Sequence, residues 1–391
     1  MSEIKVNSIK GVGASTAAIT VNNTDGTCTA NLSNRQNRNL VINGAMEVAQ
    51  RGTSSTSSGI NTVDRFGVFF SGTDEAPTQS QVDVSSGTTP YTLGFRKSLK
   101  VTNGNQTGGA GSSDYVYLAY KIEAQDLANS GWNYTSASSF ITLSFWVKSS
   151  VAQNFYGYLK SQDGTRQNYP FETGSLSADT WTKVTKTIAG DSNLEIDNNN
   201  EAGLEIVIAA FWGTDKTGTV TLNQWAAYNT NIRMPDNTST WYTTNDATLE
   251  ITGVQLEVGS VATDFEHRSF GQELALCQRY YYQVTKVGST SDVTNKPVAL
   301  GIYYTGSDFR CLIEFPQEMR AQPTFSSNDT SNSFYIHTNN QADFIDKLDG
   351  YNWTSKRAAL RNTANVSGSA GDAGFLNQET GDSNLNFSAE L

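Results

Sequence analysis

The sequence has few of the side chains on which catalytic and metal chemistry depend. It contains two histidines, His267 and His337, and three widely spaced cysteines, Cys28, Cys277 and Cys311. There is no CxxC pair, no Cys/His spacing typical of a metal site and no Gly-x-Ser-x-Gly nucleophile motif. We therefore expect no enzyme, and no catalytic residue is assigned. We expect the cysteines to be free thiols of a protein made in a reducing cytoplasm, with a Cys277–Cys311 disulfide as the alternative.

Charge is also scarce, and it is mostly negative. Charged residues make up 17% of the chain, and 27 Lys and Arg stand against 38 Asp and Glu, for a net charge of −11. No run of basic residues is present, so the electrostatic signature of a nucleic-acid partner is missing. No apolar run approaches 18 residues, and the first residues lack the pattern of a secretory signal. We expect no nucleic-acid binding, no membrane insertion and no secretory leader.

The residues that are abundant point to β-structure. The chain has 33 Gly, only 7 Pro and 11% aromatic residues, and it is rich in Ser, Thr and Asn. Long amphipathic helices draw on Glu, Lys, Ala and Leu, so this composition favours short strands joined by polar turns. The aromatic share is too high for a disordered chain.

Three regions follow one another along the chain. Residues 1–38 have scattered apolar side chains and predict an extended β-arm that orders against a neighbouring chain, with a flexible tail as the alternative. Residues 39–270 contain many short segments of alternating polarity, of which Ile141–Val147 is a clear example, and predict a β-sandwich or jelly roll. Residues 271–391 predict one helix, at 273–282, and a smaller β-rich domain.

Several phrases then give a family resemblance. Residues 39–47 read NLVINGAME, with Met46 where a Phe is usual, and residues 251–257 read ITGVQLE. They resemble the opening and closing strands of carbohydrate-binding-module-like jelly rolls in virion appendage proteins of tailed bacteriophages, particularly marine phages and cyanophages. The phrases at 315–324 and 387–391 resemble those of phage distal domains. The resemblance covers roughly residues 39–391.

This resemblance implies a structural virion protein, assembled in the host bacterial cytoplasm. The first expectation is a tail fibre that attaches to other virion proteins through residues 1–38, forms a homotrimer and binds host-surface glycan. The alternative is a head fibre or capsid decoration protein without specific receptor binding. A third possibility is a glycan-depolymerising tail spike, which would need two carboxylates facing each other across a groove.

Aromatic residues in polar surroundings are the candidates for sugar binding. Planar rings stack on the apolar faces of pyranoses, while amides and carboxylates bind the hydroxyls. Trp212, Trp225, Trp241 and Tyr242 lie in or near turns rich in Gly, Asn and Thr. The cluster Trp225–Trp241–Tyr242 is the predicted ligand site, and burial in the core is the alternative for each ring.

Two charged sets have structural interpretations. Glu47 and Glu257 match acidic positions of the opening and closing phrases, where jelly rolls of this family often hold Ca²⁺. A structural calcium ion at these two residues is therefore one expectation, and simple hydrogen-bonded edge residues are the other. Arg51, Asp64 and Arg65 predict a buried ion pair that fixes the first loop, with a contact to another virion protein as the alternative.

Overall fold

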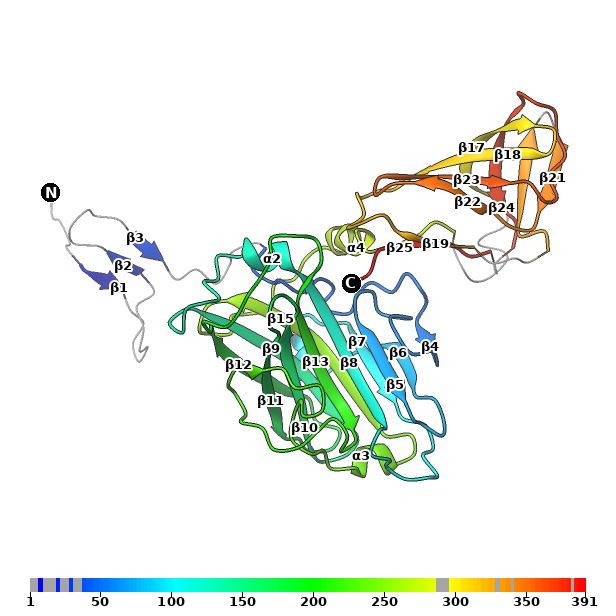
Figure 1. The fold of residues 1–391 in the computed structure, drawn as a ribbon. Coiled ribbons are helices and arrows are strands. Elements are labelled where there is room, and N and C mark those ends of the chain that lie inside the picture. The colour runs from blue at the N-terminus through cyan, green and yellow to red at the C-terminus, as the bar shows by residue number, and fades with distance from the viewer. Residues whose placement is uncertain are drawn as a thin grey trace.

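The computed structural model describes residues 6–9, 19–21, 28–30, 37–285, 295–327, 331–338, 341–380 and 383–391. Within these residues the chain is built almost entirely of antiparallel β-sheets (Figure 1). Three strands form a small N-terminal sheet, and they are β1 (Ser8–Ile9), β2 (Ile19–Val21) and β3 (Cys28–Ala30). Most of the predicted arm at 1–38 lies outside the described residues.

Two six-stranded sheets pack face to face in the central region. The first has the order β14-β11-β10-β13-β8-β5, and we call it the binding sheet; the second has the order β12-β9-β15-β7-β6-β4. The binding sheet comprises β5 (Gly67–Ser71), β8 (Tyr115–Glu123), β10 (Asn154–Ser161), β11 (Gln167–Ser175), β13 (Ala202–Trp212) and β14 (Ala226–Ala227). The second sheet comprises β4 (Ser54–Ser55), β6 (Thr78–Asp83), β7 (Lys97–Thr102), β9 (Phe140–Ser149), β12 (Thr182–Ala189) and β15 (Thr248–Val258).

Alternation along each strand decides which side chains enter the core. In β8, Val116, Leu118 and Tyr120 point between the sheets and are buried, whereas Tyr115 and Tyr117 point outward. Successive side chains of a strand lie on opposite faces, so a strand with one apolar face suits a two-sheet sandwich. The prediction of an all-β chain with a β-sandwich is confirmed.

Some local predictions are wrong. Residues 40–42 lie in the opening motif, which was expected to be a strand, but they form no regular strand, and residues 219–225 lie in a loop. The helix expected at 273–282 is α4 (Phe270–Gln278), which begins three residues earlier and ends before a strand. The remaining helices are short, namely α1 (Thr89–Thr92), α2 (Ala124–Ala128) and α3 (Thr240–Thr243).

The C-terminal region contains two more sheets. A three-stranded sheet has the order β16-β25-β19, with β16 (Tyr281–Gln283), β19 (Thr324–Ser327) and β25 (Leu385–Ser388). A seven-stranded sheet has the order β21-β20-β24-β17-β18-β23-β22. Its strands are β17 (Lys296–Thr305), β18 (Asp308–Glu314), β20 (Phe334–Thr338), β21 (Gln341–Ile345), β22 (Asp349–Trp353), β23 (Arg357–Asn362) and β24 (Ala373–Gln378).

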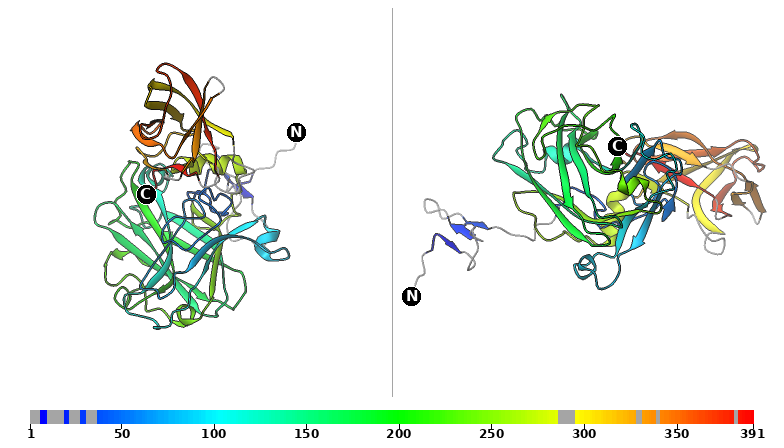
Figure 2. Two further views of the ribbon diagram at one scale, coloured as in Figure 1. Left: turned by 90° about the vertical axis from the view of Figure 1, so that its right-hand side faces the viewer. Right: turned by 90° about the horizontal axis from the view of Figure 1, so that it is seen from below.

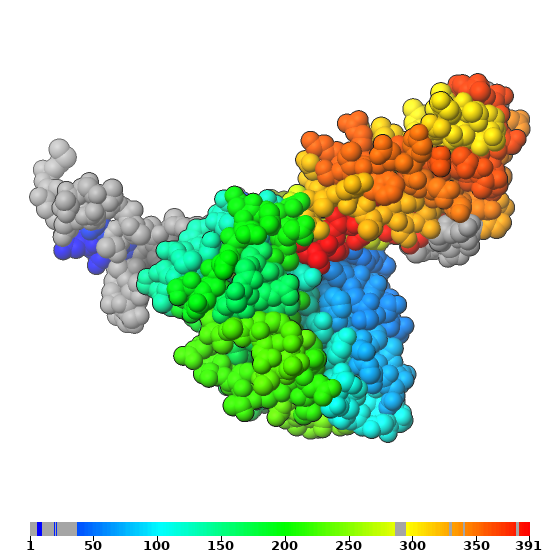
Figure 3. All heavy atoms as spheres, in the orientation of Figure 1, coloured from blue at the N-terminus to red at the C-terminus, as the bar shows by residue number. Residues whose placement is uncertain are grey.

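The end of the chain returns to the sandwich. The C-terminus lies beside α4 and the upper end of the sandwich in Figure 1, and Figure 2 shows the same arrangement from two other sides. In Figure 3 the last residues, in red, fill the junction between the sandwich and the C-terminal sheets. Lys121 Nζ donates to the Leu391 carbonyl at 3.1 Å, and the Ala389 amide donates to the Tyr280 carbonyl at 2.7 Å.

Two further features bear on the expectations above. No helix in the described part of the chain is long and apolar enough to cross a membrane. Cys277 and Cys311 are buried free thiols, so the alternative of a disulfide between them is not realised.

Candidate carbohydrate-binding surface

A row of aromatic rings crosses the outer face of the binding sheet. Phe69 on β5 is paired with Tyr117 on β8, which is paired in turn with Ala209 on β13. The ring centroids of Phe69 and Tyr117 are 5.3 Å apart with an interplanar angle of 22°. Tyr117 and Trp212 are 4.6 Å apart and nearly parallel, at 7°. We call this row, together with its neighbour Tyr115, the aromatic stripe.

Polar side chains flank the stripe on the same face. Lys160 Nζ is 2.5 Å from a carboxylate oxygen of Glu205, which also accepts from Gln162 Nε2 at 2.9 Å. Burial, followed by the charge of Glu205, raises the pKa of Tyr117, so its hydroxyl remains a neutral donor. The Arg233 guanidinium lies over the Trp212 ring, 4.5 Å from its centroid. Rings with polar groups at their edges are what a pyranose requires of its site.

The loop after β13 covers one end of the stripe. Met234 is buried against Trp212, and the Gly218 amide donates to the Met234 carbonyl at 3.0 Å. Trp212 is therefore nearly buried, although it was predicted as a ligand residue, and Phe69, Tyr115 and Tyr117 are the half-exposed rings. The rings of the stripe that are accessible for stacking are therefore those on β5 and β8.

Two buried polar atoms near this loop have no hydrogen-bond partner within the described part of the chain. They are the Nε1 of Trp212 and the Oδ1 of Asn168, whose amide nitrogen donates to the Arg233 carbonyl at 2.7 Å. A buried polar atom without a partner costs about 1–3 kcal/mol, so such atoms often mark sites of function. Both belong to the outer face of the binding sheet.

Trp225 lies at the far edge of the same sheet. It is half-buried, packs on Tyr169 with ring centroids 5.3 Å apart, and donates from Nε1 to the Ala189 carbonyl at 2.8 Å. Beside it is a hollow of about 260 Å³, whose walls include Asn168, Pro170 and Ile232. This hollow is a small pocket under the loop, separate from the exposed part of the stripe.

Trp241 and Tyr242 are the clear corrections. Both are fully buried on α3, and the Tyr242 ring packs on Phe211 with centroids 4.4 Å apart. The Tyr242 hydroxyl donates to Asp114 at 3.1 Å. Helix α3, which carries both rings, packs against the core of the sandwich. The predicted cluster Trp225–Trp241–Tyr242 is therefore not a ligand surface.

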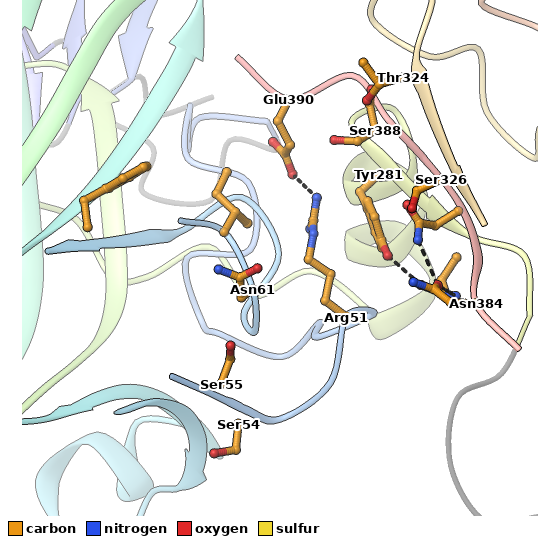
Figure 4. Close-up of a pocket in the computed structure, with 14 residues that line it drawn as sticks. Arg51, Ser54, Ser55, Asn61, Tyr281, Thr324, Ser326, Asn384, Ser388 and Glu390 are labelled. Atoms are coloured by element: carbon orange, nitrogen blue, oxygen red, sulfur yellow. Dashed lines mark hydrogen bonds and ion pairs between the residues drawn. The ribbon is translucent and has the colours of Figure 1, made fainter. Parts of the chain in front are cut away.

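A cleft of about 730 Å³ lies where the sandwich meets the three-stranded C-terminal sheet (Figure 4). Figure 4 shows Ser54, Ser55 and Asn61 on one side and Tyr281, Ser326 and Asn384 on the other, with Arg51 and Glu390 between them. Hydroxyl and amide groups dominate the lining, which is Arg51, Ser54, Ser55, Ile60, Asn61, Phe69, Tyr281, Gln283, Thr324, Ser326, Asn384, Asn386, Ser388 and Glu390. The volume is typical of a small-ligand site.

Phe69 joins the cleft to the aromatic stripe. Its ring is the first of the stripe and also forms part of the cleft wall. The ring lies over Gly67, where an added Cβ would be 2.4 Å from the ring atom Cε2. Glycine at this position therefore allows the ring to lie against the strand. The aromatic face and the polar cleft form one continuous surface.

Buried charges hold the two walls of the cleft together. Glu390 pairs with Arg65 and, at 3.1 Å, with Arg51, which also pairs with Asp64 at 3.4 Å. The predicted Arg51–Asp64 pair is thus present. Arg65 instead binds the side-chain carboxylate of Glu390 and lies over the Tyr280 ring, 3.4 Å from its centroid. Burial raises the pKa of Asp64 to about 6.

A calcium ion does not fit the residues predicted for it. The Glu257 carboxylate accepts from the Thr263 amide at 2.8 Å and hydroxyl at 2.6 Å, and Arg38 Nε is 3.5 Å away. Glu47 lies near Lys97 and Arg96, and burial raises its pKa. Within the described ranges no group of three or more His, Cys, Asp or Glu side chains is placed to hold a metal ion.

Comparison with known proteins gives distant structural similarities. No family model matches the chain, and no curated protein matches it. The enzymatically active domain of tailspike protein 4 from bacteriophage CBA120 is 11% identical, with a TM-score of 0.31, over 57% of this chain and 22% of that one. The N-terminal cellulose-binding domain of β-1,4-glucanase C from Cellulomonas fimi is 12% identical, with a TM-score of 0.26, over 55% of this chain and 99% of that one.

A family 11 carbohydrate-binding module from Clostridium thermocellum, solved with a β-1,3-1,4-mixed-linked tetrasaccharide, gives 12% identity and a TM-score of 0.25 over 55% of this chain and 98% of that one. This chain therefore spans about a fifth of the tailspike chain and nearly all of the two binding modules. At such scores the similarity does not extend to ligand or activity, and the chain's own geometry must carry the functional argument.

Proposed function

We propose that this chain is a non-enzymatic, carbohydrate-binding virion protein that takes up an oligosaccharide along the aromatic stripe and in the cleft. The observation that carries the proposal is the continuity at Phe69 between stacked rings and a cleft lined by hydroxyls and amides. Rings bind the apolar face of a pyranose, and hydroxyl and amide groups bind its edges. The length of the combined surface favours an oligosaccharide over a single sugar.

The composition of the cleft favours binding without hydrolysis. Hydrolysis of a glycosidic bond normally uses two carboxyl groups on opposite sides of the bond. Among the described residues that line the cleft, Glu390 is the single carboxylate, and it is paired with Arg51 at 3.1 Å and with Arg65. One carboxylate does not supply the opposed pair that this reaction uses.

We place the protein on the virion of a tailed phage, as a tail fibre. The phrases at 39–47, 251–257 and 315–324 support this placement, as does the exposure of the aromatic stripe. Attachment to other virion proteins through residues 1–38 and assembly as a homotrimer complete the proposal. Three copies would multiply a weak affinity for cell-surface glycan, because the second and third contacts form at high effective concentration.

Glycan-array screening followed by isothermal titration calorimetry tests the binding proposal. Phe69→Ala should raise the dissociation constant for the oligosaccharide about tenfold, since loss of a ring from such a contact costs about 1.4 kcal/mol of binding free energy. Phe270→Ala is the matched control, because Phe270 is exposed on α4 outside the surface and its loss should change nothing. Equal affinities for both variants would contradict the assignment of the surface.

Cryo-electron microscopy of the particle tests the placement. Density at the tail supports the tail-fibre proposal, whereas density on the capsid shell with the stripe covered would favour a head fibre or decoration protein. Release of shortened glycan by the purified protein would overturn the proposal of binding without hydrolysis.

A further inference from the structure

The outer face of the seven-stranded sheet carries many large apolar side chains that are exposed. Leu300 on β17 pairs with Phe375 on β24, and Leu312 on β18 pairs with Ala359 on β23, so these side chains form one continuous face. We call it the apolar face. Its large side chains are Leu300 (62% exposed), Ile302 (45%), Tyr304 (61%), Leu312 (44%), Phe344 (43%), Tyr351 (49%) and Phe375 (56%).

This face is not the core of its domain. The opposite face of the same sheet supplies the core, where Tyr303, Phe309, Ile313 and Leu360 are buried together. The sheet therefore has apolar side chains on both faces, and the described residues cover only one of the two. A sheet with one face in water normally carries polar residues there.

The size of the apolar face exceeds what a monomer usually exposes. Side chains of this size present about 150–250 Å² each, so the seven exposed fractions correspond to roughly 700 Å². Monomeric proteins rarely expose contiguous apolar patches above roughly 300–600 Å². A stable protein–protein interface buries about 800 Å² on each partner. The apolar face is thus close to the area that one partner contributes to a stable interface.

The face also carries charged side chains, and these form pairs. Arg310 lies opposite Ile302, pairs with Asp308 at 2.7 Å, and has its guanidinium 3.8 Å from the Tyr304 ring centroid. Arg357 lies opposite Glu314 on the neighbouring strand and pairs with it at 3.9 Å. The whole chain carries a net charge of −11, so most of its surface would repel a second copy, whereas this face would not. The hydroxyls of a glycan would find no hydrogen-bond partner on the aliphatic side chains of this face.

We propose that the apolar face is the surface through which copies of this chain associate. The inference rests on the proposed self-assembly and names its contact surface. Burial of the face between copies would remove Leu300, Leu312 and Phe375 from water, and this burial supplies the driving force. The aromatic stripe and the cleft lie on other sheets and keep their accessibility.

Light scattering coupled to size-exclusion chromatography tests the inference on the full chain at micromolar concentration. The wild type should have a mass that is a multiple of 42.4 kDa. The double variant Leu312→Lys/Phe375→Lys should elute at 42.4 kDa, because lysines on β18 and β24 would have to be buried between copies. Val261→Lys, at a site 68% exposed on the sandwich, is the matched control and should keep the wild-type mass.

A milder variant guards against misfolding. Ile302→Thr keeps the β-branched shape on β17 and should weaken self-association about tenfold in dissociation constant, with an unchanged circular dichroism spectrum. A wild type of 42.4 kDa, or a double variant with the wild-type mass, would overturn the inference. Oligosaccharide affinity per chain should be equal in all these variants, so failure of the glycan proposal would be seen separately.

Discussion

Glu390→Gln should destabilise the junction between the sandwich and the C-terminal sheets. Arg65 is fully buried, and its charge is balanced by Glu390, while its Nη2 donates to the Lys121 carbonyl at 2.7 Å. Removal of one partner of a buried ion pair costs about 3–5 kcal/mol, because the other charge is left in a poorly polar environment. Glutamine keeps one acceptor oxygen, so we expect the lower end of that range, about 3 kcal/mol.

A second effect works in the opposite direction. The negative charge of Glu390 contributes to the raised pKa of Asp64, so its removal would let Asp64 ionise more readily beside Arg51. This relief reduces the expected loss to about 2–3 kcal/mol. The assay is urea unfolding followed by tryptophan fluorescence, with the midpoint shifted and the slope unchanged.

The matched control for this prediction is Glu318→Gln. Glu318 pairs with Lys356 at 3.6 Å, but both side chains are more than half exposed. An exposed pair of this kind contributes about 0–1 kcal/mol. If Glu390→Gln and Glu318→Gln have the same midpoint, the buried network does not hold the junction together and the reasoning is refuted.

Two more predictions follow from the same surface. Asp64→Asn should alter the pH dependence of stability, since burial raises the pKa of Asp64 from 3.8 to about 6 in the folded state. The folded state then binds more protons than the unfolded state between these values, so the contribution of Asp64 is fully favourable below pH 4 and is lost as pH rises to 6. Over that window, urea titrations should show that the free energy of unfolding of the wild type falls by about 3 kcal/mol relative to that of Asp64→Asn. A difference between the two proteins that stays constant with pH would contradict this prediction. Gly67→Ala should displace the Phe69 ring, because the new Cβ would lie 2.4 Å from Cε2, and should weaken oligosaccharide binding about tenfold in calorimetry. Gly271→Ala, where an added Cβ has no neighbour within 4 Å, is its control, and equal binding by the two variants would show that the ring does not contact sugar.

Alternating polarity made the sandwich predictable. The segment at 115–122 has apolar side chains at every second position, and this pattern predicts a strand, which the structure shows as β8 with its core residues on one face. Strand β11 is harder to predict from the sequence, because it contains Pro170 and Gly174, which are typical of turns and loops. Strand β14 pairs with β11 only at Gln167 and Asn168. Pro170 lies beyond this pairing, where β11 is an edge strand and the missing amide donor of proline is tolerated.

Helix α4 carried a signal that was overlooked. Ser269 and Gln272 form a capping box, in which the Ser269 amide donates to the Gln272 side chain at 3.0 Å and Ser269 Oγ accepts from the Gln272 amide. The pattern Ser-x-x-Gln predicts a helix that begins at Phe270. Periodicity alone placed the start three residues too late.

Only part of the proposed binding surface could be predicted from the sequence. Trp241 and Tyr242 were assigned to it from their polar neighbours, but neighbours in sequence do not report the depth of a ring that packs on Phe211 across the core. The cleft combines residues near 51–69 with residues near 281–390, and no periodicity links segments so far apart. The role of Phe69 depends on its register with Tyr117, which sequence does not supply.

A crystal structure of the intact protein with an oligosaccharide identified by array screening tests the central claim most directly. The account predicts sugar density in the cleft between Asn61 and Asn386, with one ring stacked on Phe69. Density at another place on the molecule, with the cleft and the stripe empty, would contradict it.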